Sequence, residues 1–252
     1  MITDPWFYAL AIPAVLLVGL SKSGFGGGIA MVGVPLMALA ISPIKAAAIL
    51  LPLLVAMDII GLIAYRRQCD RPAILVLLPA AIVGIGIGWL AASIVSEAMV
   101  RLIVGVIALV FTLDHWFRQR NGDIARQPNR IAGSIWGMIA GFTSFISHAG
   151  SAPVQMYLLP LRFNPVLYAG TSVVFFATVN ALKIVPYFAL GLFSVENLAT
   201  SAILTPFAAL AMMAGIWLVR NVPAEWFYRI AYYLVFGIAL KLIWDGAWSL
   251  AS

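Results

Sequence analysis

The sequence has few charged residues and almost no cysteine. Only 10% of its 252 residues are Asp, Glu, Lys or Arg, whereas an ordinary soluble domain carries about 25%. With 63% apolar residues, the chain lacks the polar surface that would face water on all sides. The single cysteine, Cys69, excludes an intramolecular disulfide and any CxxC metal or redox motif. The composition therefore excludes a soluble enzyme, a disulfide scaffold and a disordered chain.

Ten apolar segments, separated by prolines, glycines and charges, run along the chain. Their bounds are about 5–21, 25–41, 45–65, 72–93, 97–117, 130–146, 149–161, 166–189, 195–219 and 224–250. Because about 20 apolar residues suffice for a membrane-crossing helix, we expect an all-α polytopic membrane protein. The N-terminus lacks a basic n-region and a small-residue cleavage site, which predicts that the first segment is retained.

The net charge of +6 does not indicate a nucleic-acid partner, because the basic residues lie in short loops at segment ends, where they set membrane orientation. If every segment crosses, one side carries most of them: Lys22, Arg66, Arg67, Arg71, Arg118, Arg120, Arg126, Arg130, Arg162 and Arg220. The other side keeps Lys45, Arg101 and Arg229. If the short segments turn back, the division becomes nearly even. The positive-inside rule favours the first arrangement and places both termini outside the cytoplasm.

The two halves of the chain are related by a shift of 122 residues without a gap. This shift pairs Gly19 with Gly141, Gly28 with Gly150, Pro43 with Pro165, Ala47 with Ala169, Asp58 with Asn180, and Tyr65 with Tyr187. It predicts two transmembrane repeats, 1–121 and 122–252, within one integral membrane domain. Five crossings in each repeat would give the two repeats inverted topology, a recurrent design of secondary transporters.

The second segment of each repeat is short. Segment 25–41 is barely long enough to span, and 149–161 is too short for a helix that crosses the hydrocarbon core. We expect both to be broken or partly re-entrant helices, because irregular backbone within a membrane needs protein or a water-filled cavity around it.

A glycine-rich stretch opens the first short segment and forms the first candidate site. Glycine allows close approach of the backbone to a ligand, and the start of a helix presents unpaired N–H groups to an anion. The candidate ligands are Lys22, Ser23, Gly24, Gly26, Gly27 and Gly28. Alternatively, the glycines allow tight helix packing and Lys22 marks the membrane interface. The Walker A pattern is absent.

The equivalent stretch of the second repeat carries hydroxyls, an imidazole and small residues ahead of Pro153, which suits a first helical turn. Its candidate ligands are Ser147, His148, Gly150, Ser151 and Gln155. The alternative for His148 is a packed, hydrogen-bonded side chain. A Ser147–His148 catalytic dyad is disfavoured, because adjacent residues do not readily aim at one another and no third orienting group is evident.

Polar residues inside two long segments complete the candidate site. Asp58 and its equivalent Asn180 lie well within apolar segments, where a charge usually faces a pathway or the bundle interior. Asp58 is a candidate proton-coupling carboxylate. Lys183, one turn after Asn180, would attract an anion if unpaired; the alternative is a structural Asp58–Lys183 pair. Thr171 is a weaker candidate, because hydroxyls often bond back to their own helix.

These motifs resemble those of the TauE/SafE family of sulfite and organosulfonate transporters. The likeness covers nearly the whole chain and rests on Gly24-Phe25-Gly26-Gly27-Gly28 and Val34-Pro35-Leu36 in the first repeat. In the second it rests on Ser147-His148-Ala149-Gly150, Tyr157-Leu158-Leu159-Pro160 and Asn180-Ala181-Leu182-Lys183. The second repeat has His148-Ala149-Gly150 where many relatives have a triple glycine. The resemblance implies passage of a small sulfur-containing oxyanion across the inner membrane, without a metal or cofactor.

The leading interpretation is a transporter coupled to a proton or anion gradient, with the anion bound at the midplane between the repeats. A passive anion channel would share the basic site but need no coupling carboxylate, and a membrane-embedded enzyme is a third class. The expected partners are a small anion and membrane lipid, with no nucleic acid; the direction of transport and homo-oligomer formation stay open.

Overall fold

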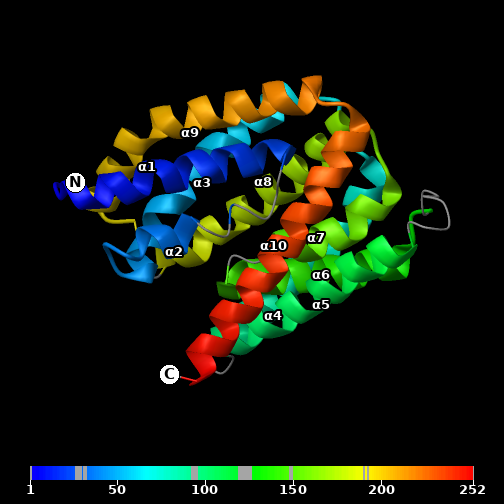
Figure 1. The fold of residues 1–252 in the computed structure, drawn as a ribbon. Coiled ribbons are helices and arrows are strands. Elements are labelled where there is room, and N and C mark those ends of the chain that lie inside the picture. The colour runs from blue at the N-terminus through cyan, green and yellow to red at the C-terminus, as the bar shows by residue number, and fades with distance from the viewer. Residues whose placement is uncertain are drawn as a thin grey trace. The chain divides into compact units, whose positions relative to one another are not determined.

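The computed structural model describes residues 2–25, 30, 33–91, 96–118, 127–147, 150–189, 191 and 193–251. Every element of regular secondary structure in this part of the chain is a helix (Figure 1). The first half contains α1 (Pro5–Leu20), the π-helical turn η1 (Ser21–Phe25), α2 (Gly33–Met37), α3 (Pro43–Ala64), α4 (Arg71–Ala91) and α5 (Glu97–Arg118). The second half contains α6 (Arg130–Ser147), α7 (Ser151–Leu158), the 3-10 turn η4 (Leu159–Leu161), α8 (Pro165–Ala189), α9 (Val195–Asn221) and α10 (Ala224–Ala251).

Seven of the described helices are long and apolar enough to cross a membrane: α1 with η1, α3, α4, α5, α8, α9 and α10. Their bounds agree with the expected segments because prolines and polar residues cap them. Asp4 and Ser194 accept hydrogen bonds from backbone N–H groups of the first turns that follow, and Pro5 and Pro43 stand at first-turn positions. The prediction of an all-α multi-pass membrane protein is confirmed.

The second segments are short here as well. α2 has five residues and α7 eight, so α7 rises only about 12 Å where the hydrocarbon core measures about 30 Å. All eight residues of α7 are buried, as a short helix without lipid-facing length requires.

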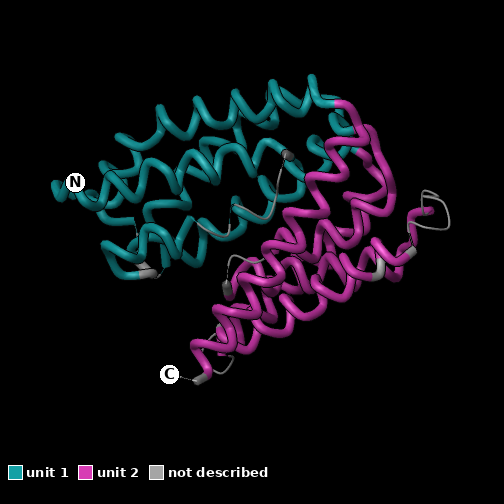
Figure 2. Tube along the Cα trace, viewed as in Figure 1, with its two compact units in different colours: residues 1–69, 165–222 teal, residues 70–164, 223–252 magenta. Residues whose placement is uncertain are grey.

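Two compact units make up the chain (Figure 2). Unit 1 comprises residues 1–69 and 165–222, which contain α1, η1, α2, α3, α8 and α9. Unit 2 comprises residues 70–164 and 223–252, which contain α4 to α7, η4 and α10. Each unit therefore takes helices from both halves of the sequence.

In unit 1, α1, α3 and α9 run in the same direction. At their N-terminal ends the Ile2 N–H donates to Thr200 Oγ1 at 3.1 Å, and Lys45 pairs with Glu196 at 3.0 Å. At the opposite end, Arg220 Nη2 donates to the carbonyl of Ala64 at 2.7 Å. The chain between α1 and α3 must therefore return to the end of the unit at which α1 begins.

Helix α8 runs antiparallel to α3. Its first turns lie at the C-terminal end of α3, where a Cβ on Gly170 would collide with the carbonyl of Gln68. Further along α8, Asn180 reaches Asp58 in the interior of α3. A two-helix contact of this kind brings polar residues from both halves of the sequence to one buried position.

In unit 2, α4 and α6 pack in parallel at backbone contact. Side chains on Gly84, Gly137 and Gly141 would collide with backbone atoms of Met138, Leu77 and Ala81. Small residues allow such close approach where the hydrophobic effect does not drive helices together.

Helix α5 packs antiparallel to α10, because Gly105 faces Ile243 whereas Phe111 stacks on Tyr232. Near the start of α10, Arg229 lines a cavity together with Arg162. The expectation that Arg229 lies on the other side of the membrane from Arg162 is therefore wrong. Arg229 lies less than two turns after Ala224, the first residue of α10, so it stays near the N-terminal end of that helix.

We expect Gly141→Ala to lower the melting temperature of the detergent-purified protein, at a cost of about 1–3 kcal/mol, because the methyl group would overpack the α4–α6 contact. Gly86→Ala on α4 is the matched control. Nothing lies within 4 Å of a Cβ at Gly86, so we expect a neutral or stabilising effect of up to about 1 kcal/mol. Equal melting temperatures for the two variants would contradict the close packing.

Candidate functional site

The turn η1 breaks the first helix of unit 1. After Leu20 the backbone continues as a π-helical turn, and Gly24 takes φ +99°, in the left-handed region that favours glycine. A side chain at Gly24 would also collide with Ala169 on α8. The break thus places Lys22 inside unit 1 rather than at the end of a straight helix.

Hydrogen bonds and close packing hold η1 in place. Tyr65, directly after α3, donates its hydroxyl to the carbonyl of Ser23 at 2.7 Å. Burial raises the pKa of the Tyr65 phenol well above its usual value, although the charge of Arg220 opposes the shift, so the hydroxyl stays protonated and able to donate. Gly215 on α9 leaves room for Ser23, whose Oγ a Cβ at Gly215 would touch. The position of Lys22 is therefore fixed by α3 and α9.

Lys22 forms an ion pair with Asp58. The side chains are 7% and 5% exposed, so the pair is buried. The Asn180 amide donates to the second carboxylate oxygen, Asp58 Oδ2, at 2.7 Å. Asp58 is thus held between a lysine from the first half of the chain and an amide from the second. That amide belongs to Asn180, the residue that the 122-residue shift pairs with Asp58.

Lys183 is a second buried cation in unit 1. It lies one turn after Asn180 on α8 and is 1% exposed. Asp58 pairs with Lys22, so the alternative of a structural Asp58–Lys183 pair is not observed. Among the described residues no carboxylate forms a salt bridge with Lys183. Among the described residues of unit 1, two lysines are thus buried and one of them is paired with a carboxylate.

Two candidate hydroxyls are engaged by their own helices. Ser23 donates to the carbonyl of Leu20 and Thr171 to that of Leu167, both at 2.7 Å. Each oxygen keeps its acceptor lone pairs, but the proton that would reach an anion is already directed to the backbone.

In unit 2 the second motif begins α7. Gly150 is its N-cap residue and packs against Ser144 and the carbonyl of Ala140. Ser151 and Gln155, one turn apart, are 6% and 3% exposed, and within the described part of the chain neither Ser151 Oγ nor Gln155 Nε2 has a hydrogen-bond partner. Buried polar groups are normally paired, so the Ser151 hydroxyl and the Gln155 amide could each donate a hydrogen bond to a ligand or a water molecule.

The remaining predicted ligands carry less structural information. Ser147 is the last residue of α6. Gly26, Gly27, Gly28 and His148 lie outside the described residues. The candidate site among the described residues is therefore the Lys22–Asp58–Asn180–Lys183 cluster of unit 1, and Ser151 and Gln155 form a polar position in unit 2.

Sequence reasoning found the members of the cluster but missed two of its contacts. The ion pair joins Asp58 to Lys22, 36 positions earlier in the chain, rather than to Lys183 on the neighbouring helix. Tyr65 was matched to Tyr187 only as a repeated aromatic, yet its hydroxyl anchors η1. Its place at the end of an expected helix, directly before the basic residues Arg66 and Arg67, was the available signal.

The described residues contain no group of three or more His, Cys, Asp or Glu side chains that could hold a metal ion. Their chemistry is that of ion pairs and amide donors buried among membrane-spanning helices. Such a fold defines a multi-pass membrane protein with charged side chains buried inside its helix bundle, and buried charges of this kind are usually functional. A family model described as sulfite exporter TauE/SafE matches residues 11–242.

Because this match covers nearly all of the chain, the chain belongs to the TauE/SafE sulfite exporter family, as the motifs predicted. This is a family of membrane transporters for sulfite and related sulfur anions, not of enzymes. No curated protein and no solved structure was found to match the chain.

We expect Asp58→Asn to destabilise the protein by about 3–5 kcal/mol, because it leaves the Lys22 ammonium buried without a counter-charge. Thermal unfolding in detergent measures the effect. The double variant Lys22→Met/Asp58→Leu should recover most of the loss, since it removes both charges. Glu196→Gln, which breaks the half-exposed pair with Lys45, should cost at most about 1 kcal/mol. An Asp58→Asn variant as stable as Glu196→Gln would contradict the buried pair.

Proposed function

We propose that this protein is an inner-membrane secondary transporter of small sulfur-containing oxyanions, of the sulfite or organosulfonate type. The observation that carries the proposal is the imbalance of buried charge in unit 1, where Lys22 and Lys183 share the single carboxylate of Asp58. An unpaired charge away from water is costly. A bound monoanion would balance it, and Lys183 is the cation most available to hold one.

The anion site that we propose lies between the two repeats. Lys22 and Asp58 belong to the first repeat, and Asn180 and Lys183 to the second. Asp58 lies six residues before the end of α3, about 9 Å from that end, so an anion beside it would be well inside the hydrocarbon layer. Ser151 and Gln155 offer a second polar position, within unit 2, for the same kind of ligand.

Helix directions support inverted repeats. If a two-fold axis in the membrane plane relates the repeats, α3 and its counterpart α8 must run antiparallel, and so must α5 and α10. Both pairs do. The same axis would exchange the parallel pair α1–α9 with the parallel pair α6–α4, and both are parallel. The hydrogen bond between the equivalent residues Asp58 and Asn180 fits a position on that axis.

The same directions favour a broken helix that crosses the membrane, rather than a re-entrant helix, as the second segment of the first repeat. A segment that turned back would leave α1 and α3 antiparallel, whereas they run in the same direction. An interrupted crossing segment is also where transporters of inverted-repeat design bind their substrates.

Proton coupling follows from competition for Lys22. While Asp58 is ionised, it holds the Lys22 ammonium in an ion pair. A proton on Asp58 would free that ammonium, leaving two cations for the anion, so proton and anion would bind together and each would raise the affinity for the other. A passive anion channel, the second candidate, needs the two lysines but no titrating carboxylate.

We expect Lys183→Met to weaken binding of sulfite and of short sulfonates at least tenfold, because a charged hydrogen-bond donor is lost from a buried site. Ligand-dependent thermal shift and isotope uptake measure the effect. Lys241→Met is the matched control: it removes a lysine from a partly exposed pair with Asp245, and anion affinity should stay at the wild-type value. His148→Ala, tested alongside, should also weaken binding. Wild-type affinity in Lys183→Met would remove Lys183 from the site.

We expect Asp58→Asn in proteoliposomes to lose uptake driven by a pH gradient while it keeps anion exchange, since the amide cannot take up the coupling proton. The retained exchange also shows that the variant is folded. Unchanged pH-driven flux would contradict coupling through Asp58 and favour the channel.

A transporter is also distinguished from an enzyme by the fate of its substrate. We expect intact substrate to be recovered on the far side of the membrane, whereas chemical consumption of the substrate by purified protein would favour an enzyme.

A further inference from the structure

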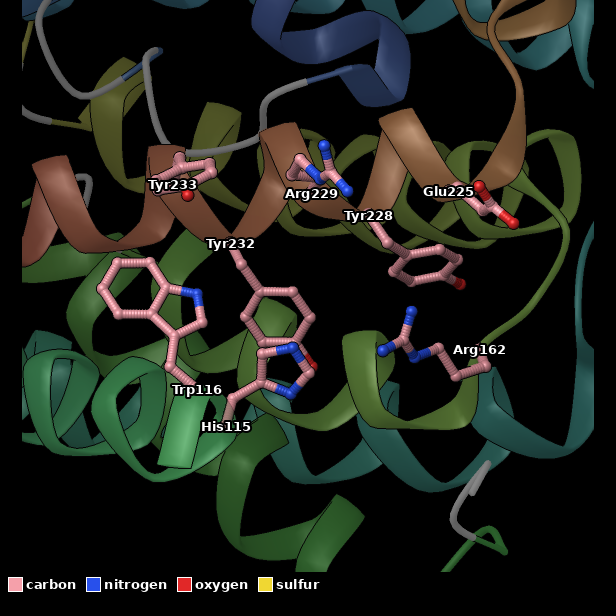
Figure 3. Close-up of a pocket in the computed structure, with 8 residues that line it drawn as sticks. All are labelled: His115, Trp116, Arg162, Glu225, Tyr228, Arg229, Tyr232 and Tyr233. Atoms are coloured by element: carbon pink, nitrogen blue, oxygen red, sulfur yellow. The ribbon is translucent and has the colours of Figure 1, made fainter. Parts of the chain in front are cut away.

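A cavity of about 520 Å³ lies in unit 2, apart from the cluster that the proposed function uses (Figure 3). Its volume falls within the range of roughly 300–1,000 Å³ that is typical of small-molecule sites. The last turn of α5 contributes His115 and Trp116, the first turns of α10 contribute Glu225, Tyr228 and Arg229, and Arg162 follows η4. None of these side chains has a role in the transport mechanism proposed above.

The Arg162 guanidinium is held in place by an aromatic ring that is itself fixed by a hydrogen bond. The guanidinium lies over the Tyr228 ring, with Cζ 4.8 Å from the ring centroid. The Tyr228 hydroxyl in turn donates to the carbonyl of Phe163 at 2.6 Å, which fixes the ring. A guanidinium carries five N–H donors in a rigid planar fork, which is the geometry that matches phosphate oxygens.

The backbone at Arg162 is also unusual. Its φ of +52° lies in the left-handed region, which residues other than glycine seldom adopt. Such conformations persist where the surrounding structure demands them, and they cluster at binding sites. At Arg162 the conformation aims the side chain under Tyr228 and into the cavity (Figure 3).

The described lining residues include two arginines and several aromatic rings. Arg162 and Arg229 are accompanied in this set by one carboxylate, that of Glu225. The Arg229 guanidinium lies over the Trp226 ring, with Cζ 4.9 Å from the ring centroid, and His115 stacks face to face on Tyr232 with ring centroids 3.5 Å apart. These ring contacts hold the walls in place, and two guanidinium groups in one cavity suit an anionic ligand.

The ends of two membrane-spanning helices line this cavity, and their lengths indicate how deep in the membrane the cavity lies. α10 spans 27 residues from Ala224 to Leu250, about 40 Å, so it extends beyond a hydrocarbon core of about 30 Å into the headgroup layer. α5 ends at Arg118, within one turn of His115. Trp and Tyr are enriched at this level of a membrane, where lipid phosphates also lie.

We propose that this cavity binds a phosphate group, of the kind carried by an anionic phospholipid headgroup, with Arg162 as its principal ligand and Arg229 as the second cation. Arginine matches phosphate oxygens with two parallel N–H donors. Basic pockets between helices on the cytoplasmic side commonly hold acidic headgroups. The same chemistry would accept a soluble phosphate, and the experiment separates the two sources.

The test uses the full-length protein purified in a neutral detergent. Native mass spectrometry and thermal shift follow titration with phosphatidylglycerol, with phosphatidylcholine, and separately with inorganic phosphate and glycerol 3-phosphate. We expect phosphatidylglycerol to bind and stabilise, and Arg162→Gln to weaken that binding at least fivefold. Arg130→Gln, an exposed arginine of unit 2 that lies outside the cavity, is the matched control and should bind as the wild type does.

Glu225→Gln keeps the proposal falsifiable if Arg162→Gln proves unstable. Removing the only carboxylate of the lining should tighten binding severalfold, whereas damage to the fold would weaken it. Binding of phosphatidylglycerol but not of the soluble phosphates assigns the site to lipid, and binding of both assigns it to phosphate in general. Equal binding by wild type and Arg162→Gln, equal binding of phosphatidylcholine, or no binding by any probe would overturn the proposal. Sulfite affinity, measured on the same samples, should not change in these variants.

Discussion

The ion pair between Lys22 and Asp58 is the interaction around which unit 1 is organised. Neither charge can be left alone among apolar helices, because an isolated ion away from water is strongly unfavourable. The lysine can reach the carboxylate only because α1 breaks at η1, and the break is stable only because Gly24 accepts a left-handed conformation against α8. Helix interruption, glycine and buried charge are thus parts of one constraint.

That constraint also joins the two halves of the chain. Asn180 completes the coordination of Asp58 from α8, and these two residues occupy equivalent places in the two halves of the chain. Duplication of a single ancestral unit would have put the same residue type at both places. Here one copy carries a carboxylate and the other an amide, so the pair can share a hydrogen bond without placing two negative charges together. The divergence makes the contact stable and leaves a single titratable group there.

Transport and lipid binding, as proposed, use different chemistry in different units. In unit 1, an anion and a carboxylate compete for buried lysines, which suits a small solute that must be released again. In unit 2, the Arg162 guanidinium lies over a fixed tyrosine ring, and its rigid planar shape suits a phosphate that stays bound. The difference between a flexible ammonium and a rigid guanidinium separates the two roles.

Helix bounds were predictable because they depend on local signals: proline at Pro5 and Pro43, caps at Asp4 and Ser194, and the length of each apolar run. The family motifs were likewise visible in the order of residues, as were Asp58, Asn180 and Lys183 as polar residues within apolar helices. The partner of Asp58 was not, because two lysines were available and only the fold of η1 brings Lys22 to it. The arginine cavity was hidden for the same reason, since His115, Arg162 and Arg229 come from three separate stretches. The sequence by itself determined which segments are helical and which charges are buried, through short-range propensity and hydrophobicity; the tertiary structure decided which charges meet, because pairing depends on helix directions and breaks that no local pattern encodes.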